Sequence, residues 1–185
     1  IITKSFPLNA DTSIPAVGFG TFLISQDDVA AAVRAAIGVG YRHIDTAVVY
    51  DNEEGVGEGI RAALKDNNLT REDIFVTTKL WPGVAGWNET PKNREQTRDD
   101  FEASLKRLGL DYVDLYLIHS PHGGDQRLEQ WKALLDIKSI GKARSIGVSN
   151  FNQSHLDEIK TAGLVLPEAN QIELHPWSQK SGLIA

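Results

Sequence analysis

The sequence predicts an α/β protein built as a TIM-type (β/α)8 barrel, and three observations support this expectation. Short runs rich in β-branched and aromatic residues recur roughly every 25–38 residues, about the length of one β-α unit. The stretches between them place apolar residues at the spacing of one helical face. The runs themselves are nearly continuous in apolar residues, as is typical of parallel strands covered on both faces.

The strands are expected in a regular order along the chain. Residues 2–8 and 12–15 flank a turn at 9–11, which predicts a hairpin in front of the first barrel strand at 17–19. Further strands are expected at residues 43–45, 75–80, 113–119, 145–148 and 170–174. The chain would thus carry the N-terminal hairpin and about six β-α units, forming one barrel domain over residues 1–185 that is incomplete at its C-terminus.

The helices are predicted from periodic apolar residues and from their ends. Three faces are apolar, namely Val29, Val33, Ala36 and Ile37; Phe101, Leu105 and Leu108; and Leu128, Trp131 and Leu135. Ser25 is placed to cap the first of these helices, and Gly109, Gly141 and Gly163 are placed to end helices in the left-handed conformation. A sixth helix is expected over residues 178–185.

Composition excludes several classes of function. The 185 residues carry a net charge of −6 with scattered basic residues, which argues against a nucleic-acid surface. No apolar run approaches the roughly 20 residues of a membrane helix, and Lys4 and Asn9 interrupt any signal-peptide core. Without cysteine there is neither a disulfide nor a thiolate metal site. These features favour a soluble, cytoplasmic enzyme acting on a small molecule.

Four polar residues stand at or just after predicted strand ends: Asp45, Tyr50, Lys79 and His119. In a parallel barrel the C-terminal strand ends meet at one rim, so these side chains are expected to converge. A lysine beside a tyrosine lowers the phenol pKa, and an aspartate can hold that lysine charged and in place. Each residue alone has a structural reading, such as Asp45 capping a helix that begins near Asn52. Together they favour a proton-transfer site, with Tyr50 as general acid and His119 orienting a carbonyl oxygen.

Several longer motifs carry a family resemblance. Residues 40–47 with Tyr50, Asn52 and Glu53 form the first, and residues 105–119 the second. Residues 141–151, followed by 170–176, form the others. In this order the motifs resemble the aldo-keto reductase family. The resemblance implies a (β/α)8 barrel that reduces aldehydes or ketones with NADPH. The alternative is a scaffold of the same family that binds cofactor as a regulatory subunit without catalysis.

The resemblance also implies how NADPH or NADP+ would be held. Ser149, Asn150 and Gln171 match the family's nicotinamide-holding residues, with Asp45 beside them, and Gly20 and Thr21 are expected near the pyrophosphate. Carboxamide side chains offer both the donor and the acceptor that a nicotinamide carboxamide needs. Asn150 and Asn152 also have a reading as turn and helix-cap residues. No G-x-G-x-x-G loop follows a strand, so a Rossmann-type dinucleotide site is not expected.

The substrate wall is expected to be apolar, formed by Phe22 and Trp81. Where many members of the family carry a tryptophan after the histidine, this chain has Ser120, which is expected to widen the pocket. Residues 85–90 are interpreted as an insertion at the rim. His122 and His175 lack a third ligand at useful spacing, so no metal site is predicted.

A complete barrel takes about 250 residues, so strands 7 and 8 and the family's 2′-phosphate loop are expected beyond Ala185. The parent protein is expected to be a monomer. A chain of residues 1–185 alone would leave two strand edges unpaired, and we expect it to associate and to have little reductase activity.

Overall fold

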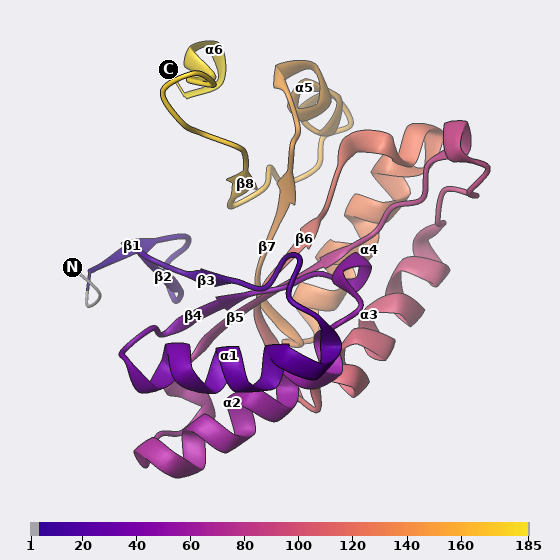
Figure 1. Ribbon diagram of the computed structural model, residues 1–185. Helices are drawn as coiled ribbons and strands as arrows, with labels where there is room; N and C mark the ends of the chain where they lie inside the picture. Colours follow the sequence, from indigo (N-terminus) through magenta and orange to yellow (C-terminus); the bar gives the residue numbers. More distant parts are fainter. Residues whose placement is uncertain (1–3, 185) are drawn as a thin grey trace.

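The computed structural model describes residues 4–184, and a six-stranded parallel sheet lies at its centre (Figure 1). The strands pair in chain order from β3 to β8, so each contacts the next strand along the sequence. Their bounds are Phe19–Gly20 (β3), His43–Asp45 (β4), Phe75–Leu80 (β5), Val113–Ile118 (β6), Ala143–Ser149 (β7) and Asn170–Gln171 (β8). Parallel strands in this order, each followed by a helix, agree with the predicted (β/α)8 architecture.

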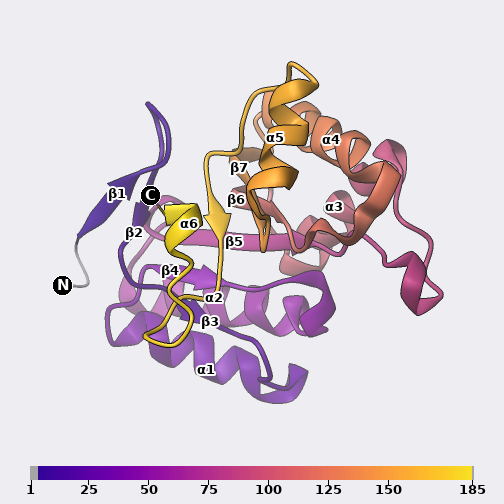
Figure 2. The same cartoon turned by 90° about the horizontal axis from the view of Figure 1, so that it is seen from above.

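Helices cover the outer face of the curved sheet, as the view from above shows (Figure 2). They are Gln26–Gly38 (α1), Glu53–Asn67 (α2), Arg94–Leu108 (α3), Arg127–Ser139 (α4) and Gln153–Thr161 (α5), whereas Ser181–Ile184 (α6) stands away from the sheet (Figure 1). The predicted apolar faces of α1, α3 and α4 pack against the strands and contribute Val33, Phe101 and Trp131 to the main hydrophobic core. Burial of this apolar surface is the main source of stability for such a layer.

The contact of α2 with its neighbours depends on glycine. A Cβ atom at Gly57 would lie 2.0 Å from the carbonyl oxygen of Leu108, and one at Gly59 would lie 2.6 Å from that of Ala30. Neither distance is possible for a real side chain, so these positions let α2 approach α1 and the end of α3.

The predicted hairpin is present as Ser5–Pro7 (β1) and Ser13–Pro15 (β2), paired antiparallel, while Ile2 and Thr3 lie outside the described residues. Its turn reaches the sheet, where Asn9 Nδ2 donates to Ser145 Oγ at 2.9 Å. Apolar side chains of the hairpin pack on inward-facing residues of β5 and β6; the group comprises Leu8, Ile14, Phe75, Leu115 and Leu117. The hairpin therefore covers the N-terminal strand ends and leaves the C-terminal ends for the site.

The predicted helix ends are confirmed. Ser25 Oγ accepts a hydrogen bond from Asp28 N at 3.2 Å, which caps α1. Gly109, Gly141 and Gly163 have φ angles of 64°, 77° and 69°, the left-handed conformation that ends a helix with little strain in glycine. No helix among residues 4–184 combines the length and apolar character needed to cross a membrane.

Several predicted ranges differ from the structure, and the strand expected at 113–119 ends at Ile118. The first barrel strand is Phe19–Gly20 instead of residues 17–19, and the last is Asn170–Gln171 instead of 170–174. Both strands lie at an edge of the sheet and have one partner strand each, so few backbone groups enter the ladder. The helix expected at 178–185 is reduced to α6, because a bridge between His175 and Ser178 and a left-handed Lys180 come before it. Ala185 lies outside the described residues.

Candidate active site

The ends of β4, β5 and β6 bring the four predicted polar residues together. Lys79 Nζ donates to Asp45 Oδ1 at 2.5 Å and to the carbonyl oxygen of Thr46 at 2.8 Å. The hydroxyl of Tyr50, on the 3-10 turn Val48–Tyr50 (η1) that follows β4, lies 3.5 Å from the same Nζ. The ring of His119 packs edge-on to Tyr50, with centroids 5.6 Å apart.

Asp45 has partners that exclude the helix-capping alternative. Its Oδ1 is paired with Lys79, and its Oδ2 accepts from Gln171 Nε2 at 2.8 Å. The cap residue of α2 is Asn52, which makes no side-chain capping bond. The carboxylate therefore joins the lysine on β5 to the edge strand β8.

Lys79 is fully buried, and burial lowers the pKa of its ammonium while the Asp45 carboxylate opposes that shift. A buried cation without a counter-ion is costly, so the two charged groups depend on one another. Together they form an ion pair that stands directly beside the phenol of Tyr50.

The pKa of the Tyr50 phenol is shifted in the direction opposite to the one that the sequence predicted. Burial, together with the nearby Asp45 carboxylate, raises the pKa of Tyr50 to about 12, whereas the lysine was expected to lower it. The physical reason is that burial of the phenol disfavours its charged form, and the Asp45 carboxylate adds to this effect. The phenol therefore keeps its proton at neutral pH, which a general acid requires.

His119 is neutral at neutral pH. Burial and the charge of Lys79 lower the pKa of its imidazole to about 4. Its Nδ1 is buried and has no hydrogen-bond partner within the described part of the chain. A neutral ring of this kind can donate one hydrogen bond but is not a source of protons, as the predicted orienting role requires.

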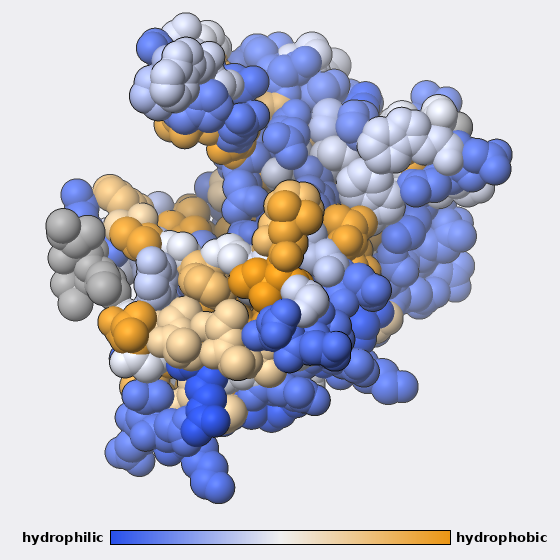
Figure 3. Space-filling model, in the orientation of Figure 1, coloured by the Kyte–Doolittle hydropathy of each residue, from blue (hydrophilic) through white to orange (hydrophobic). Residues whose placement is uncertain are grey.

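A cavity of about 790 Å³ opens above these side chains. Its lining comprises Gly18, Gly20, Phe22, His43, Asp45, Tyr50, His119, Ser149, Asn150, Gln171, Ile172 and Glu173. Phe22 packs on Tyr50 with centroids 5.0 Å apart. Figure 3 shows an apolar group over the loop between β3 and α1, where Phe22 and Leu23 are exposed. The size suits a small organic ligand.

The residues predicted to hold a cofactor lie mostly along one side of this cavity. Ser149 Oγ donates to the carbonyl oxygen of Gln171 at 2.9 Å, and Asn150 Nδ2 donates to that of His119 at 3.1 Å. Asn150 is left-handed, and Asn152 is the helix cap, as expected, accepting from His155 N at 3.1 Å. The Ser149 hydroxyl and the Asn150 carboxamide thus join the end of β7 to the backbone of β8 and of the residue after β6.

Thr21, by contrast, does not line the cavity. Its side chain is fully buried, its Oγ1 donates to the carbonyl oxygen of Asp45 at 3.3 Å, and its backbone N–H donates to the same oxygen at 3.0 Å. These bonds give Thr21 a role in joining the β3–α1 loop to β4. Gly20 does face the cavity, and no atom lies within 4 Å of where its Cβ would be.

Two predicted substrate residues sit apart from the cavity lining. Trp81 packs edge-on to His119 with centroids 5.9 Å apart, so it contacts the proton-transfer site from the side of β5. Ser120 is buried and its Oγ lies 3.1 Å from Nδ1 of His122, two residues further along the same segment. Ser120 was expected to widen the pocket, but it is not among the residues that line the cavity.

Sequence reasoning missed the groups that support the site. Asn52 is fully buried and donates to the carbonyl oxygens of Thr21 and Ile24, both at 2.9 Å. Glu53 accepts from Thr78 Oγ1 at 2.6 Å and from Arg107 Nε at 2.7 Å. Both residues stand in the first quoted motif, and a polar pair at the start of an amphipathic helix is the signal that could have indicated buried partners.

The two histidines considered for a metal lie on different segments. His122 contacts Ser120, and His175 Nε2 lies 2.8 Å from Glu173 Oε1. Within residues 4–184, no three His, Cys, Asp or Glu side chains gather as a metal site would require.

Comparison with known proteins assigns the family. Residues 16–185 match the model of the aldo/keto reductase family, and the chain belongs to that family. It is 43% identical over 178 residues to an uncharacterized oxidoreductase of Bacillus subtilis, covering 96% of this chain and 61% of that protein. It is 45% identical over 179 residues to morphine 6-dehydrogenase of Pseudomonas putida, covering 96% of this chain and 57% of that protein. The chain thus spans less than two thirds of the length of these relatives.

Solved structures agree with the family and the fold. The aldo-keto reductase of Bombyx mori, in complex with NADP, superposes with a TM-score of 0.88 at 41% identity, covering 100% of this chain and 62% of that one. The aldo/keto reductase of Brucella melitensis gives a TM-score of 0.87 at 45% identity, covering 98% and 67%. The parallel sheet described above is accordingly part of a (β/α)8 barrel.

Proposed function

We propose that the protein reduces the carbonyl group of a small aldehyde or ketone to an alcohol, using NADPH. The observation that carries the proposal is the buried Lys79–Asp45 pair, whose ammonium lies 3.5 Å from the Tyr50 hydroxyl at the floor of a cavity. Membership in the aldo/keto reductase family supports the same reaction class.

The cavity's donor set fits a nicotinamide. Ser149, Asn150 and Gln171 bring a hydroxyl and two carboxamides to one wall, beside the Asp45 carboxylate. A carboxamide on the ligand requires donors and acceptors of this kind. When bound, the reduced nicotinamide supplies the hydride. The choice of NADPH over NADH rests on the family and on the Bombyx mori relative, which was solved with NADP.

The chain's own residues handle the proton. Negative charge develops on the carbonyl oxygen during reduction, so a donor must lie at that oxygen. Tyr50 holds its proton at neutral pH and donates it, and the adjacent Lys79 ammonium stabilises the phenolate left behind. The neutral His119 donates a hydrogen bond that orients the carbonyl. Phe22 covers the cavity mouth with an apolar surface.

The test is Tyr50→Phe in the whole protein, measured by loss of NADPH absorbance with a generic aldehyde. We expect turnover to fall about 10³-fold, because the proton donor is removed, while NADPH binding measured by fluorescence stays within about twofold. Tyr41→Phe is the matched control, since Tyr41 packs on Phe19 and does not line the cavity.

Two outcomes would contradict the proposal. Turnover of Tyr50→Phe within a few-fold of the parent would exclude Tyr50 as the acid. A parent protein that binds NADPH but oxidises none with any aldehyde would favour the alternative, a regulatory scaffold of the same family.

A further inference from the structure

A group of three fully buried polar side chains lies next to the proton-transfer site. They are Thr21, Thr46 and Asn52, and none of them lines the cavity. Thr46 Oγ1 donates to Asn52 Oδ1 at 3.0 Å, and Thr21 Oγ1 lies 3.5 Å from the same oxygen. Burying a polar group costs free energy unless it is hydrogen-bonded, so the three side chains depend on one another.

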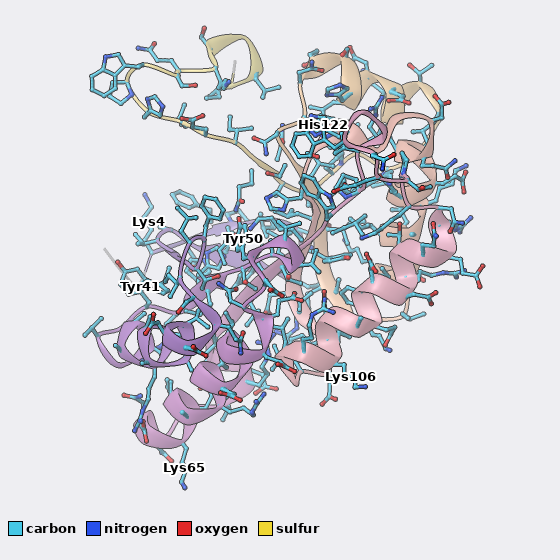
Figure 4. All side chains as sticks on the ribbon, turned by 45° about the vertical axis from the view of Figure 1, so that its right-hand side comes forward. Lys4, Tyr41, Tyr50, Lys65, Lys106 and His122 are labelled. Atoms are coloured by element: carbon cyan, nitrogen blue, oxygen red, sulfur yellow. The ribbon has the colours of Figure 1, made fainter. Side chains whose placement is uncertain are left out.

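The hydrogen bond between Thr46 and Asn52 closes the segment that carries Tyr50. Tyr50 lies between these two residues in the sequence, on the turn η1, and Figure 4 shows it near the middle of the molecule, above the helices α1 and α2. Asp51 ends the turn in the left-handed conformation, with a φ angle of 52°, and Asn52 directly precedes α2. Because the side-chain bond joins the two ends of this short segment, it restricts where the Tyr50 hydroxyl can lie.

Thr46 also carries an acceptor for Lys79. Its carbonyl oxygen accepts from Lys79 Nζ at 2.8 Å, and the Tyr50 hydroxyl lies 3.5 Å from the same Nζ. Thr46 thus bonds to Lys79 through its carbonyl group and to Asn52 through its hydroxyl. A shift of Thr46 would therefore change the distance between the ammonium and the phenol.

Asn52 is itself held from two sides. Its Nδ2 donates to the carbonyl oxygens of Thr21 and Ile24, both at 2.9 Å, and so bridges the loop after β3. The backbone N–H of Thr21 in turn donates to the carbonyl oxygen of Asp45 at 3.0 Å. On the other side, the close contact at Gly57 holds α2 against the end of α3. A residue fixed in this way can fix others.

We infer that Thr46 is a positioning residue for proton transfer and that it acts through Asn52. Their buried hydrogen bond keeps the Tyr50 hydroxyl and the Lys79 ammonium at a set separation, although neither residue touches substrate or cofactor. The inference rests on the proposed carbonyl reduction and adds two residues to it. A purely structural role of the same bond would lower stability and leave the proton-transfer step unchanged.

The first test compares Thr46→Val with Thr46→Ser in the whole protein. Valine keeps the shape of threonine and removes the hydroxyl, whereas serine keeps the hydroxyl. With NADPH and a generic aldehyde, Thr46→Val should lower kcat about tenfold, because a misplaced acid slows the reaction, and should leave the KM for NADPH within about twofold. Its solvent isotope effect on kcat should rise, since proton transfer becomes slower. Thr46→Ser should retain most of the turnover.

Thr97→Val is the matched control. Thr97 is also fully buried, and its Oγ1 donates to the carbonyl oxygen of Asn93 at 2.8 Å, at the start of α3. Both valine variants should lose thermal stability, because each removes a buried hydrogen bond. The control should keep the kcat and the isotope effect of the parent. Equal kcat values in the two valine variants would overturn the inference.

The part played by Asn52 is tested by a double-mutant cycle. In an Asn52→Ala background, Thr46→Val should change kcat by less than about twofold, because the partner of the hydroxyl is already gone. A full further loss of about tenfold would show that the hydroxyl acts through another contact, and it would overturn the role of Asn52.

An NMR measurement separates this inference from the proposed function. The ring signals of Tyr50, assigned by Tyr50→Phe in protein with isotope-labelled tyrosine, should shift in Thr46→Val and stay in place in Thr46→Ser and Thr97→Val. This result does not require turnover. Unchanged Tyr50 signals in Thr46→Val would overturn the inference. Absence of turnover in the parent protein, with the Tyr50 signals shifted as expected, would overturn only the proposed reaction.

Discussion

The centre of the described sheet and its edge at β8 differ in how they are held. β5 and β6 are buried along their whole length, lie between neighbouring strands and are covered by α3 and α4. β8 has two residues and one partner strand, and the chain after it exposes Leu174, Trp177 and Ile184. In Figure 1 this last segment stands away from the rest of the molecule, at the opposite side from α1 and α2.

The difference shows which parts of the site are rigid before any ligand binds. Lys79 is fixed by Asp45, by the Thr46 carbonyl and by complete burial. Gln171 is exposed, and its side chain contacts the site through one hydrogen bond to Asp45. Lys79 and Asp45 are thus fixed in the core, whereas the Gln171 side chain, at the sheet edge, is held by a single hydrogen bond.

The largest effect on turnover is expected from a substitution at the centre of the sheet. Lys79→Met should lower turnover about 10³-fold, because the phenolate of Tyr50 loses its neighbouring cation. It also leaves Asp45 unpaired, so the free energy of unfolding should change as well. Turnover with saturating NADPH and thermal unfolding are the measurements. Lys65→Met, on the last turn of α2, is the matched control. Turnover near that of the parent would exclude a role for the ion pair.

A second substitution is expected to reduce stability around the central strand β5, at a residue that does not line the cavity. Glu53→Ala should lower the free energy of unfolding by about 3 kcal/mol, because Arg107 and the buried Thr78 lose their acceptor. Denaturant unfolding measures this, with Glu54→Ala as control, since Glu54 is exposed on the same turn. If both variants lose equal stability, the buried bonds of Glu53 contribute nothing specific.

At the edge strand β8, a substitution is expected to have a smaller effect, on cofactor binding more than on stability. Gln171→Ala should weaken NADPH binding about fivefold, the equivalent of one hydrogen bond, and change the free energy of unfolding by less than about 0.5 kcal/mol. Fluorescence titration with NADPH measures the first quantity. Gln179→Ala, in the exposed segment before α6, serves as control. A large loss of stability would mean that the edge is as rigid as the core.

The last change concerns one proton, on the imidazole of His119 after the central strand β6. The pKa of His119 is lowered to about 4 from its ordinary 6.5, so the unfolded chain binds that proton first as the pH falls. The free energy of unfolding should therefore decrease between about pH 6.5 and 4 and have no further contribution from His119 below. An NMR titration of the imidazole, assigned by His119→Asn, checks this. A midpoint near 6.5 would contradict the buried, neutral ring.

The residue pattern along the chain predicted strands correctly where each strand has a neighbouring strand on both sides. Residues 43–45 and 75–80 form strands as predicted, and the predicted strand at 145–148 lies inside Ala143–Ser149. These runs are buried between neighbours on both sides, so their apolar character and their structure agree. The predictions at 170–174 and 178–185 were wrong in extent, because an edge strand and the segment after it lack the partners that the pattern assumes.

The sequence by itself determined the order of the β-α units, the helix caps and the four residues at the strand ends, because each depends on spacing along the chain. Only the tertiary structure decided how those residues behave. Burial of the phenol, together with the nearby Asp45 carboxylate, raises the pKa of Tyr50, and the Thr21 side chain is fully buried. It also decided that Trp87, in a loop interpreted as a rim insertion, stacks on Trp81, the neighbour of His119. Desolvation and contacts between distant segments set these properties, and neither is a function of sequence spacing.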